Sequence, residues 1–354
     1  MTKVNPSPRI HYIDVLKGLA IYLICLYHFG KIQLVDSMNV INVILLTICS
    51  CAVPIFFMCS GAVLLNKDIN FKLYIKKIIK LILLTGIWAI LTTVILMLFR
   101  YKTINIIEVI KIVVEWRINW INHFWFLHAM LVVYLFYSIL KIVIDKDIKY
   151  IYILLGFIIV TVFGNNFLNI CYSLFKYVTT GTLTGITSVN FINFLNIFSD
   201  KYLYVLAYFI VGGLLYRKRL YIKYTMSKYI VLIILLLTMI IYIVLNTYML
   251  KITNYNYDIV WNGYQNIFTL ILSVGISTLA QTMRIKNCKW IVSIGTNTFG
   301  IFILHWIVGF IMQDYFVPTN IVIDLFYVFL IVGSCDVIVC IMKRIPVIKN
   351  LFKF

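Results

Sequence analysis

The sequence predicts an all-α protein, a polytopic bundle of about ten transmembrane helices with both termini in the cytoplasm. Hydrophobic residues make up 63% of the 354-residue chain and charged residues only 12%, whereas soluble domains have about half and a quarter. Apolar runs of about 20 residues, long enough to cross a bilayer, recur along the whole sequence. The basic residues gather in alternate connecting segments, which adds an orientation to this fold class.

The apolar runs predict ten spans, near residues 11–30, 41–65, 77–99, 123–144, 150–165, 202–216, 229–250, 264–283, 290–312 and 321–342. The fifth and sixth are short or interrupted. Asp14 and Lys17 break the first run and no small-residue cleavage site follows it, so we expect a membrane helix there and not a cleaved signal peptide. We expect a single integral-membrane domain over residues 1–354.

The net charge of +19 could indicate nucleic-acid binding, but the distribution of the charge argues against it. With the N-terminus in the cytoplasm, 22 of the 31 Lys and Arg residues fall in inside segments and 8 in outside segments, and Lys17 lies within a helix. This excess fits the positive-inside rule and an even number of spans. The expected partner of the basic surface is therefore the lipid bilayer, with no nucleic acid.

Two longer polar stretches, 100–122 and 165–201, lie outside in this topology. Within the first, residues 104–121 alternate apolar pairs with charges at helical spacing, which predicts an amphipathic helix on the outer surface. The second is rich in Asn, Thr, Ser and Gly. It predicts a surface loop with at most one short helix.

The first helix carries three ionisable residues that are unusual at membrane depth. Lys17 and His28 are eleven positions apart, which places them on one helix face roughly 16 Å apart, and Asp14 falls within about 40° of His28. Charged groups inside a membrane are costly, so such a stripe indicates a functional site. An ion pair between Asp14 and Lys17 is a structural alternative, but it leaves His28 unexplained. A neutral imidazole suits general-base catalysis.

A second group of candidates is basic. Lys76, Lys77 and Lys80 recur at three- and four-residue spacing at the cytoplasmic start of the third helix. They form either an ordinary positive-inside flank or a phosphate site for an anionic cytoplasmic ligand. The spacing leaves both interpretations open.

Further ionisable and aromatic residues lie near the outer ends of predicted helices. His305 is in the ninth helix, and His123 and Trp125 open the fourth. Trp125 and Trp306 are typical of an aromatic belt, and membrane His128 is typical of a helix–helix hydrogen bond. The sequence does not identify a partner for Asp336 in the tenth span.

Metal and nucleotide chemistry find no support in the sequence. No P-loop, HExxH, GxSxG or zinc spacing is present, and we expect no metal. Six of the eight cysteines lie in predicted spans and no CxxC pair occurs, which predicts buried thiols that pack as small apolar groups.

Four segments together resemble the acyltransferase family 3, the bacterial integral-membrane O-acyltransferases. Ile13-Asp-Val-Leu-Lys-Gly-Leu-Ala-Ile followed by His28 resembles that family's opening helix. Val53-Pro-Ile-Phe-Phe-Met-Cys-Ser-Gly61 is similar to its second-helix motif. His123-Phe-Trp-Phe-Leu127 and Gly295-Thr-Asn-Thr-Phe-Gly-Ile-Phe-Ile-Leu-His305 are similar to its two later histidine segments. The motifs occur in the family's order and cover most of the chain.

The resemblance implies a ten-helix O-acetyltransferase of cell-surface glycans in the bacterial cytoplasmic (inner) membrane. It would take acetyl from cytoplasmic acetyl-CoA and deliver it to a hydroxyl of an extracytoplasmic or lipid-linked sugar. Lys17 and the Lys77–Lys80 pair stand where the family has arginine. These substitutions keep the charge but lose the planar fork that binds phosphate or carboxylate through two hydrogen bonds.

The resemblance also implies roles for individual residues. His28 would be the general base. Lys17 would either stabilise charge on the thioester side or orient a carboxylate, and Asp14 would hold Lys17. His305 would be a second base or a hydrogen-bond donor on the acceptor side. Lys76, Lys77 and Lys80 would bind acyl-CoA, and His123 and Trp125 would bind the acceptor. The alternative from another class is a transporter or flippase of a lipid-linked or anionic solute, which predicts broken helices in matching halves.

Overall fold

The structure is a computed structural model that describes residues 10–30, 40–99, 123–181, 203–252, 263–283 and 288–352, together with Lys111. Within these ranges the chain forms helices and short connections, without a strand. The helix predicted over residues 104–121 lies outside the described residues except for Lys111, as does the second half of the 165–201 stretch.

The helices follow the predicted order. In the chain they are α1 (His11–Phe29), α2 (Val40–Cys49), α3 (Ala52–Leu64), α4 (Phe71–Leu98), α6 (Trp125–Lys146), α7 (Ile148–Ile158), a π-helical turn η4 (Ile159–Gly164), α8 (Asn165–Thr180), α9 (Leu203–Arg217), α10 (Arg219–Thr225), α11 (Lys228–Ile252), α13 (Ile267–Thr282), α14 (Lys289–Tyr315), α15 (Ile321–Met342) and a 3₁₀ turn η6 (Ile348–Phe352). In the described chain, eight helical stretches are long and apolar enough to cross a membrane, and α9 and α13 are shorter apolar helices. The prediction of an all-α polytopic membrane bundle is confirmed.

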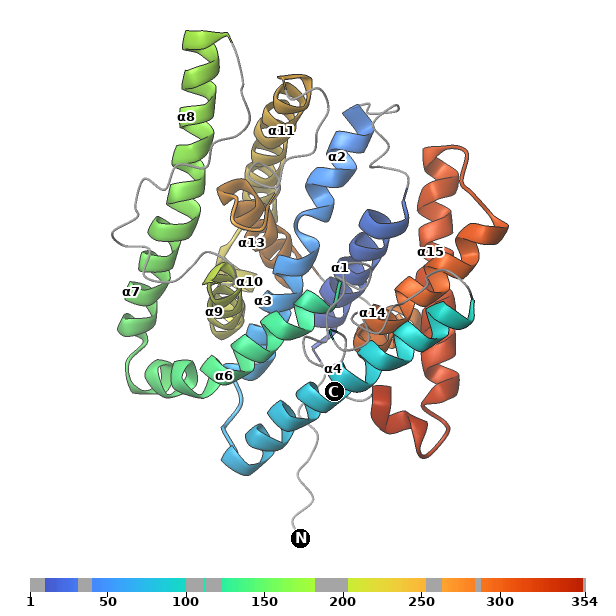
Figure 1. The fold of residues 1–354 in the computed structure, drawn as a ribbon. Helices are drawn as coiled ribbons and strands as arrows, with labels where there is room; N and C mark the ends of the chain where they lie inside the picture. Colours follow the sequence, from blue (N-terminus) through green and yellow to red (C-terminus); the bar gives the residue numbers. More distant parts are fainter. Residues whose placement is uncertain are drawn as a thin grey trace.

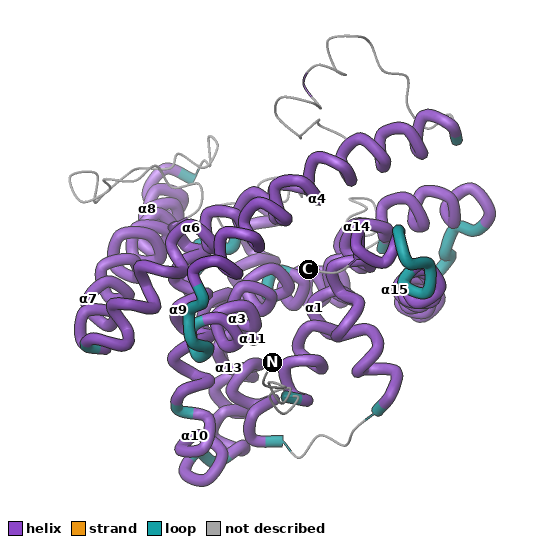
Figure 2. The backbone as a smooth tube through the Cα atoms, turned by 90° about the horizontal axis from the view of Figure 1, so that it is seen from below, coloured by secondary structure: helices purple, strands orange, loops and turns teal. Residues whose placement is uncertain are grey.

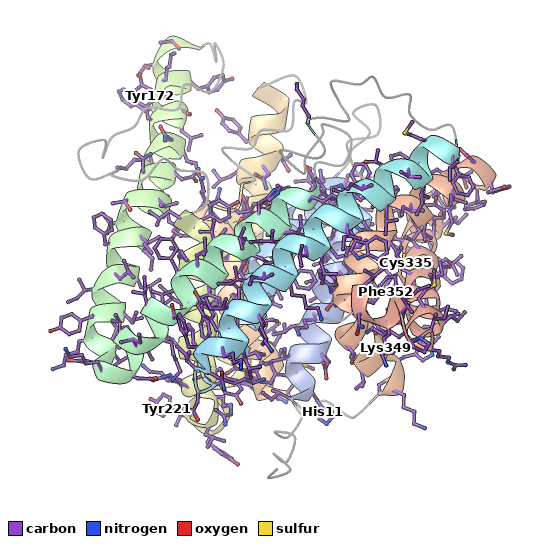
Figure 3. All side chains as sticks on the ribbon, turned by 60° about the horizontal axis from the view of Figure 1, so that its bottom comes forward. His11, Tyr172, Tyr221, Cys335, Lys349 and Phe352 are labelled. Carbon is purple, nitrogen blue, oxygen red and sulfur yellow. The ribbon has the colours of Figure 1, made fainter. Side chains whose placement is uncertain are left out.

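The bundle has α1, α3 and α9 near its middle, α7 and α8 at one edge, and α14 and α15 at the opposite edge (Figure 1). Helix α4 crosses the outside of the bundle obliquely, which is also visible from below (Figure 2). Figure 3 places His11 and Lys349 toward one end of the molecule and Tyr172 at the other. The beginning of α1 and the segment after α15 thus lie at the same end, as an even number of spans requires.

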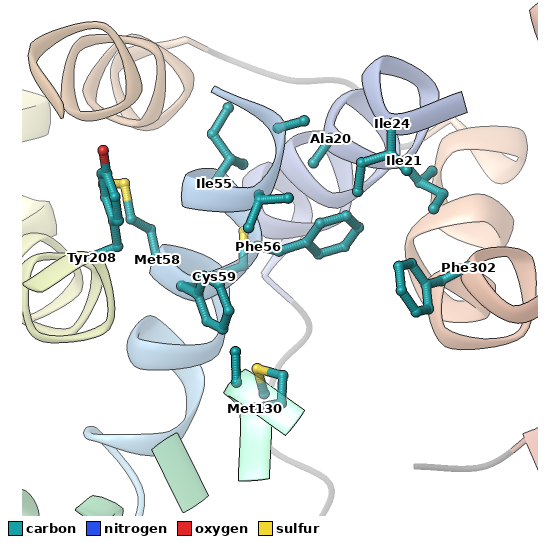
Figure 4. Packing of buried hydrophobic residues seen from close by; sticks show 14 of the residues in the cluster. Ala20, Ile21, Ile24, Ile55, Phe56, Met58, Cys59, Met130, Tyr208 and Phe302 are labelled. Carbon is teal, nitrogen blue, oxygen red and sulfur yellow. The ribbon is translucent and has the colours of Figure 1, made fainter. Parts of the chain in front are cut away.

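The centre of the core is a close approach of α3 to α9, and α3 also packs against α1 (Figure 4). Glycines allow the approach of α9. A Cβ atom on Gly61 would lie 1.8 Å from the carbonyl oxygen of Phe209, and one on Gly212 would lie 2.0 Å from that of Met58. Membrane helices gain stability from such backbone proximity, because lipid gives apolar side chains little reason to associate.

The second predicted span, 41–65, is interrupted. Helix α2 ends at Cys49 and α3 begins at Ala52, with Ser50 and Cys51 in a turn. Pro54 explains the interruption. It has no N–H to donate to the Ser50 carbonyl, and its ring would clash with that carbonyl in a regular helix.

The third span begins at Phe71, earlier than the predicted residue 77. Asn70 caps the helix by accepting a hydrogen bond from the backbone N–H of Leu73 at 3.1 Å, a role for which asparagine is preferred. All of Lys76, Lys77 and Lys80 therefore lie within the first three turns of α4.

The loop prediction for residues 165–201 is wrong in its first part. Helix α7 continues through η4 into α8, which ends where Gly181 adopts a left-handed φ of 67°, a common glycine C-cap. Three of its polar residues, Asn166, Asn169 and Ser173, form a buried stripe at helical spacing.

Candidate active site

Helices α1 and α14 lie side by side, and glycines on α14 make room for α1 at two levels. A Cβ atom on Gly295 would lie 2.7 Å from the Cα of Asp14, and one on Gly309 would lie 2.3 Å from the ring of Phe29. This packing brings the C-terminal part of α1, with His28 and Phe29, against the second half of α14, with His305 and Gly309. As a result, the His28 ring lies 5.6 Å from the His305 ring and 5.4 Å from the Trp306 ring, measured between centroids.

His123 joins this group from the turn that precedes α6. Its ring centroid is 5.3 Å from that of His305. It also stacks on Trp306 with centroids 4.8 Å apart and ring planes 10° from parallel. Three histidines that are far apart in the sequence therefore meet at one place, and we call His28, His123, His305 and Trp306 the histidine cluster.

Trp306 lies in a different environment from the aromatic belt that the sequence predicted for it. An aromatic belt would place the ring against lipid headgroups, whereas in the structure it packs on His28, His123, Phe29 and Phe310. Helical periodicity cannot reveal this contact, because it depends on the distant segment that carries His123.

A backbone contact sets the protonation of His305. Its Nδ1 atom hydrogen-bonds the carbonyl oxygen of Phe302. Because a carbonyl oxygen only accepts, Nδ1 must carry the proton, and Nε2 of the neutral ring holds a lone pair. Figure 4 shows Phe302 projecting from α14 into the core below α1.

Accessibility distinguishes His28 from its neighbours. His123 and His305 are 3% and 0% exposed, whereas His28 is an exposed residue. A reactive group needs such access to reach a substrate. The position is therefore suited to a general base.

The histidine cluster also contains buried nitrogen atoms that have no hydrogen-bond partner within the described part of the chain. They are Nδ1 and Nε2 of His123, Nε2 of His305 and Nε1 of Trp306. Each unpartnered buried polar group costs about 1–3 kcal/mol. Such a concentration needs an explanation.

Lys17 and Asp14 lie nearer the beginning of α1. Asp14 is 8% exposed and packs against Gly295, and Lys17 is half-buried. The ion pairs that the structure gives among described residues do not include one between Asp14 and Lys17. Both side chains lie near enough to Cys59 of α3 for their charges to act on its thiol.

A small hollow lies close to these residues, between α1, α3, α9 and α13. Tyr12, Cys59 and Gln281 are among the residues around it, and it has room for about one water molecule. The hydroxyl oxygen of Tyr12 and Oε1 of Gln281 are buried without a hydrogen-bond partner in the described chain. Two unpartnered polar atoms thus belong to residues around this hollow, in the half of the bundle where α1 begins.

The other predicted site residues are not part of the histidine cluster. Lys76 and Lys77 are exposed on α4, and Lys80 is half-exposed. Trp125 stacks on Tyr264, with centroids 5.7 Å apart and planes 27° from parallel. The structure therefore unites His28, His123 and His305 and leaves Trp125 and the lysines at separate positions.

Asp336, which the sequence left without a partner, takes part in a polar network between α14 and α15. It accepts hydrogen bonds of 2.7 Å from Ser293 Oγ and from Asn297 Nδ2. Lys343 in turn donates to Asn297 Oδ1. Interhelical hydrogen bonds of this kind stabilise membrane bundles, so the network has a structural explanation.

In the described ranges, no group of three or more His, Cys, Asp or Glu side chains is arranged to hold a metal ion.

Fold and site together define a multi-pass membrane protein with a group of histidines inside its helical bundle. Residues 10–340 match the family model of an acyltransferase domain, that of acyltransferase family 3. The protein belongs to this family and is a membrane acyltransferase. Neither a curated protein nor a solved structure matches the chain.

Proposed function

We propose that the protein is an O-acyltransferase that moves an acyl group, taken to be acetyl, from cytoplasmic acyl-CoA to a hydroxyl of an extracytoplasmic or lipid-linked cell-surface polysaccharide. The expected location is the bacterial cytoplasmic (inner) membrane. The observation that carries the proposal is the meeting of His28, His123 and His305 around an accessible imidazole.

In the proposed reaction, His28 removes the proton from the acceptor hydroxyl. The hydroxyl oxygen bonds to the thioester carbonyl carbon, the carbon–sulfur bond breaks, and CoA leaves as its thiol after taking the proton from the imidazolium. General-base catalysis contributes about 10²–10⁴-fold in rate. Because Nδ1 of His305 is committed to Phe302, the free Nε2 favours a role as second base over a role as hydrogen-bond donor.

The donor side is proposed to begin at the end of the bundle where α1 starts. Lys76, Lys77 and Lys80 present positive charge to the phosphates of CoA. Lys17 stabilises charge on the thioester side, and Asp14 holds Lys17. The hollow beside Cys59 is lined by Ile13 and Leu16, the chain neighbours of Asp14 and Lys17 on α1.

The acceptor is proposed to approach from the opposite end. His123 belongs to the histidine cluster, and the half-exposed Trp125, two residues further along the chain, offers a flat aromatic surface. Tyr264, stacked on Trp125, extends this surface and was not identified from the sequence.

A transporter or flippase is supported by one observation, the interrupted helix α2–α3, since transporters bind solutes at broken helices. The interruption is explained locally by Pro54. The match to an acyltransferase family over residues 10–340 favours transfer chemistry.

Replacing His28 tests the proposal. In cells that lack the native gene, the wild-type protein should restore base-labile acetate on the surface polysaccharide, and His28→Ala should reduce it at least about 100-fold at equal membrane levels. Restoration of full acetylation by His28→Ala would refute the assignment of His28.

A further inference from the structure

The proposed acyl transfer gives no role to Trp306. The surroundings of its side chain indicate a role in that same reaction, so this inference rests on the proposed function. Its indole Nε1 is buried and has no partner among the described residues, although the ring stacks on His123 and lies 5.4 Å from His28. Native proteins rarely leave buried polar groups unsatisfied without a functional reason.

The four unpartnered nitrogens of the histidine cluster differ in whether they donate or accept a hydrogen bond. Indole Nε1 can only donate a hydrogen bond, and a neutral His123 has one donor and one acceptor nitrogen. Nε2 of His305 is an acceptor, because Nδ1 donates to the Phe302 carbonyl. The site therefore offers two N–H donors to a ligand that carries an acceptor oxygen.

The stacking fixes the position of the Trp306 N–H. The Trp306 and His123 rings stack with centroids 4.8 Å apart and planes 10° from parallel, and the His28 ring lies 5.4 Å from that of Trp306. A donor held in place before the substrate arrives meets the condition for efficient electrostatic stabilisation.

We propose that Trp306 Nε1–H donates a hydrogen bond to the thioester carbonyl oxygen during acyl transfer. When the acceptor oxygen bonds to the carbonyl carbon, the π electrons of the C=O bond move to the carbonyl oxygen and make it an oxyanion. The Trp306 donor stabilises that negative charge until the carbon–sulfur bond breaks. His28 moves the proton, and Trp306 acts as a catalytic hydrogen-bond donor.

The test measures labelled acetate transferred from [¹⁴C]acetyl-CoA to the glycan fraction of membranes that contain the full-length protein. Trp306→Phe keeps an aromatic ring and removes the N–H. We expect kcat to fall about 10²–10³-fold, the usual effect of one oxyanion donor, with KM for acetyl-CoA nearly unchanged. Trp290→Phe is the matched control, because Trp290 lies on the same helix, is 61% exposed and stacks on Phe329.

A kcat for Trp306→Phe equal to that of the wild type, or an effect on KM alone, would overturn the assignment. If the variant does not reach the membrane, incorporation of 3-benzothienylalanine at position 306 removes the N–H with almost no change in shape, and the same loss of kcat is expected. Wild-type membranes that transfer no label would instead count against the proposed function.

Discussion

At the scale of single residues, lysines occupy the positions where the family pattern has arginines. Lys77 is exposed on α4 and Lys80 is half-exposed. Lys67 lies near enough to Lys77 for the two positive charges to repel each other. A lysine ammonium binds phosphate as a point charge, without the two-pronged geometry of arginine. If these residues bind CoA, attraction at long range should matter more than any single hydrogen bond.

We therefore predict that Lys77→Glu/Lys80→Glu raises the apparent KM for acetyl-CoA several-fold, and that the effect shrinks as salt screens the charges. The measurement is the initial rate of acetyl transfer at 0.05 and 0.5 M salt, about 14 and 4 Å in Debye length. Lys146→Glu/Lys149→Glu, the same charge change on exposed residues near α7, is the control. An unchanged KM would contradict CoA binding and leave the α4 lysines as a positive-inside flank that orients the helix in the membrane.

At the scale of elements, the contact between α3 and α9 depends on two glycines. Gly61 would place a Cβ atom 1.8 Å from the backbone of α9, and backbone atoms cannot move aside as a flexible side chain can. Gly61→Ala should therefore push the helices apart and destabilise the bundle by at least about 1–3 kcal/mol, the usual cost of overpacking.

The measurement for Gly61→Ala is thermal unfolding of the detergent-solubilised protein, where we expect a Tm several degrees below the wild type. Gly156→Ala is the control, because a Cβ atom there meets nothing within 4 Å among the described residues. Since alanine favours helix more than glycine does, Gly156→Ala should keep or slightly raise the Tm. A wild-type Tm for Gly61→Ala would contradict the close α3–α9 packing.

The elements also show what the sequence could and could not predict. Long apolar runs placed α14 and α15 within a few residues of their observed bounds. The bounds were missed where a single residue acts on the backbone, such as the Asn70 cap or the Pro54 break. The polar face of α8 was missed because Asn and Ser indicate loops in composition, whereas their helical spacing indicates a buried stripe.

At the scale of the whole molecule, the site depends on contacts that periodicity cannot predict. Periodicity placed Lys17 and His28 on one face of one helix. That His123 and Trp306 stack against each other beside His28 follows only from how α1, α6 and α14 pack. The sequence motifs identified each histidine separately as a candidate, and the fold brings the three side chains together.

We propose that the histidine cluster acts on acetyl-CoA that enters from the side of the membrane where α1 begins. The most direct measurement adds [¹⁴C]acetyl-CoA, which does not cross membranes, to sealed inside-out and right-side-out vesicles with equal amounts of protein. We predict labelled glycan only in inside-out vesicles with the wild-type protein, and none in either kind with His28→Ala. Equal labelling in right-side-out vesicles, or wild-type labelling by His28→Ala, would contradict the claim.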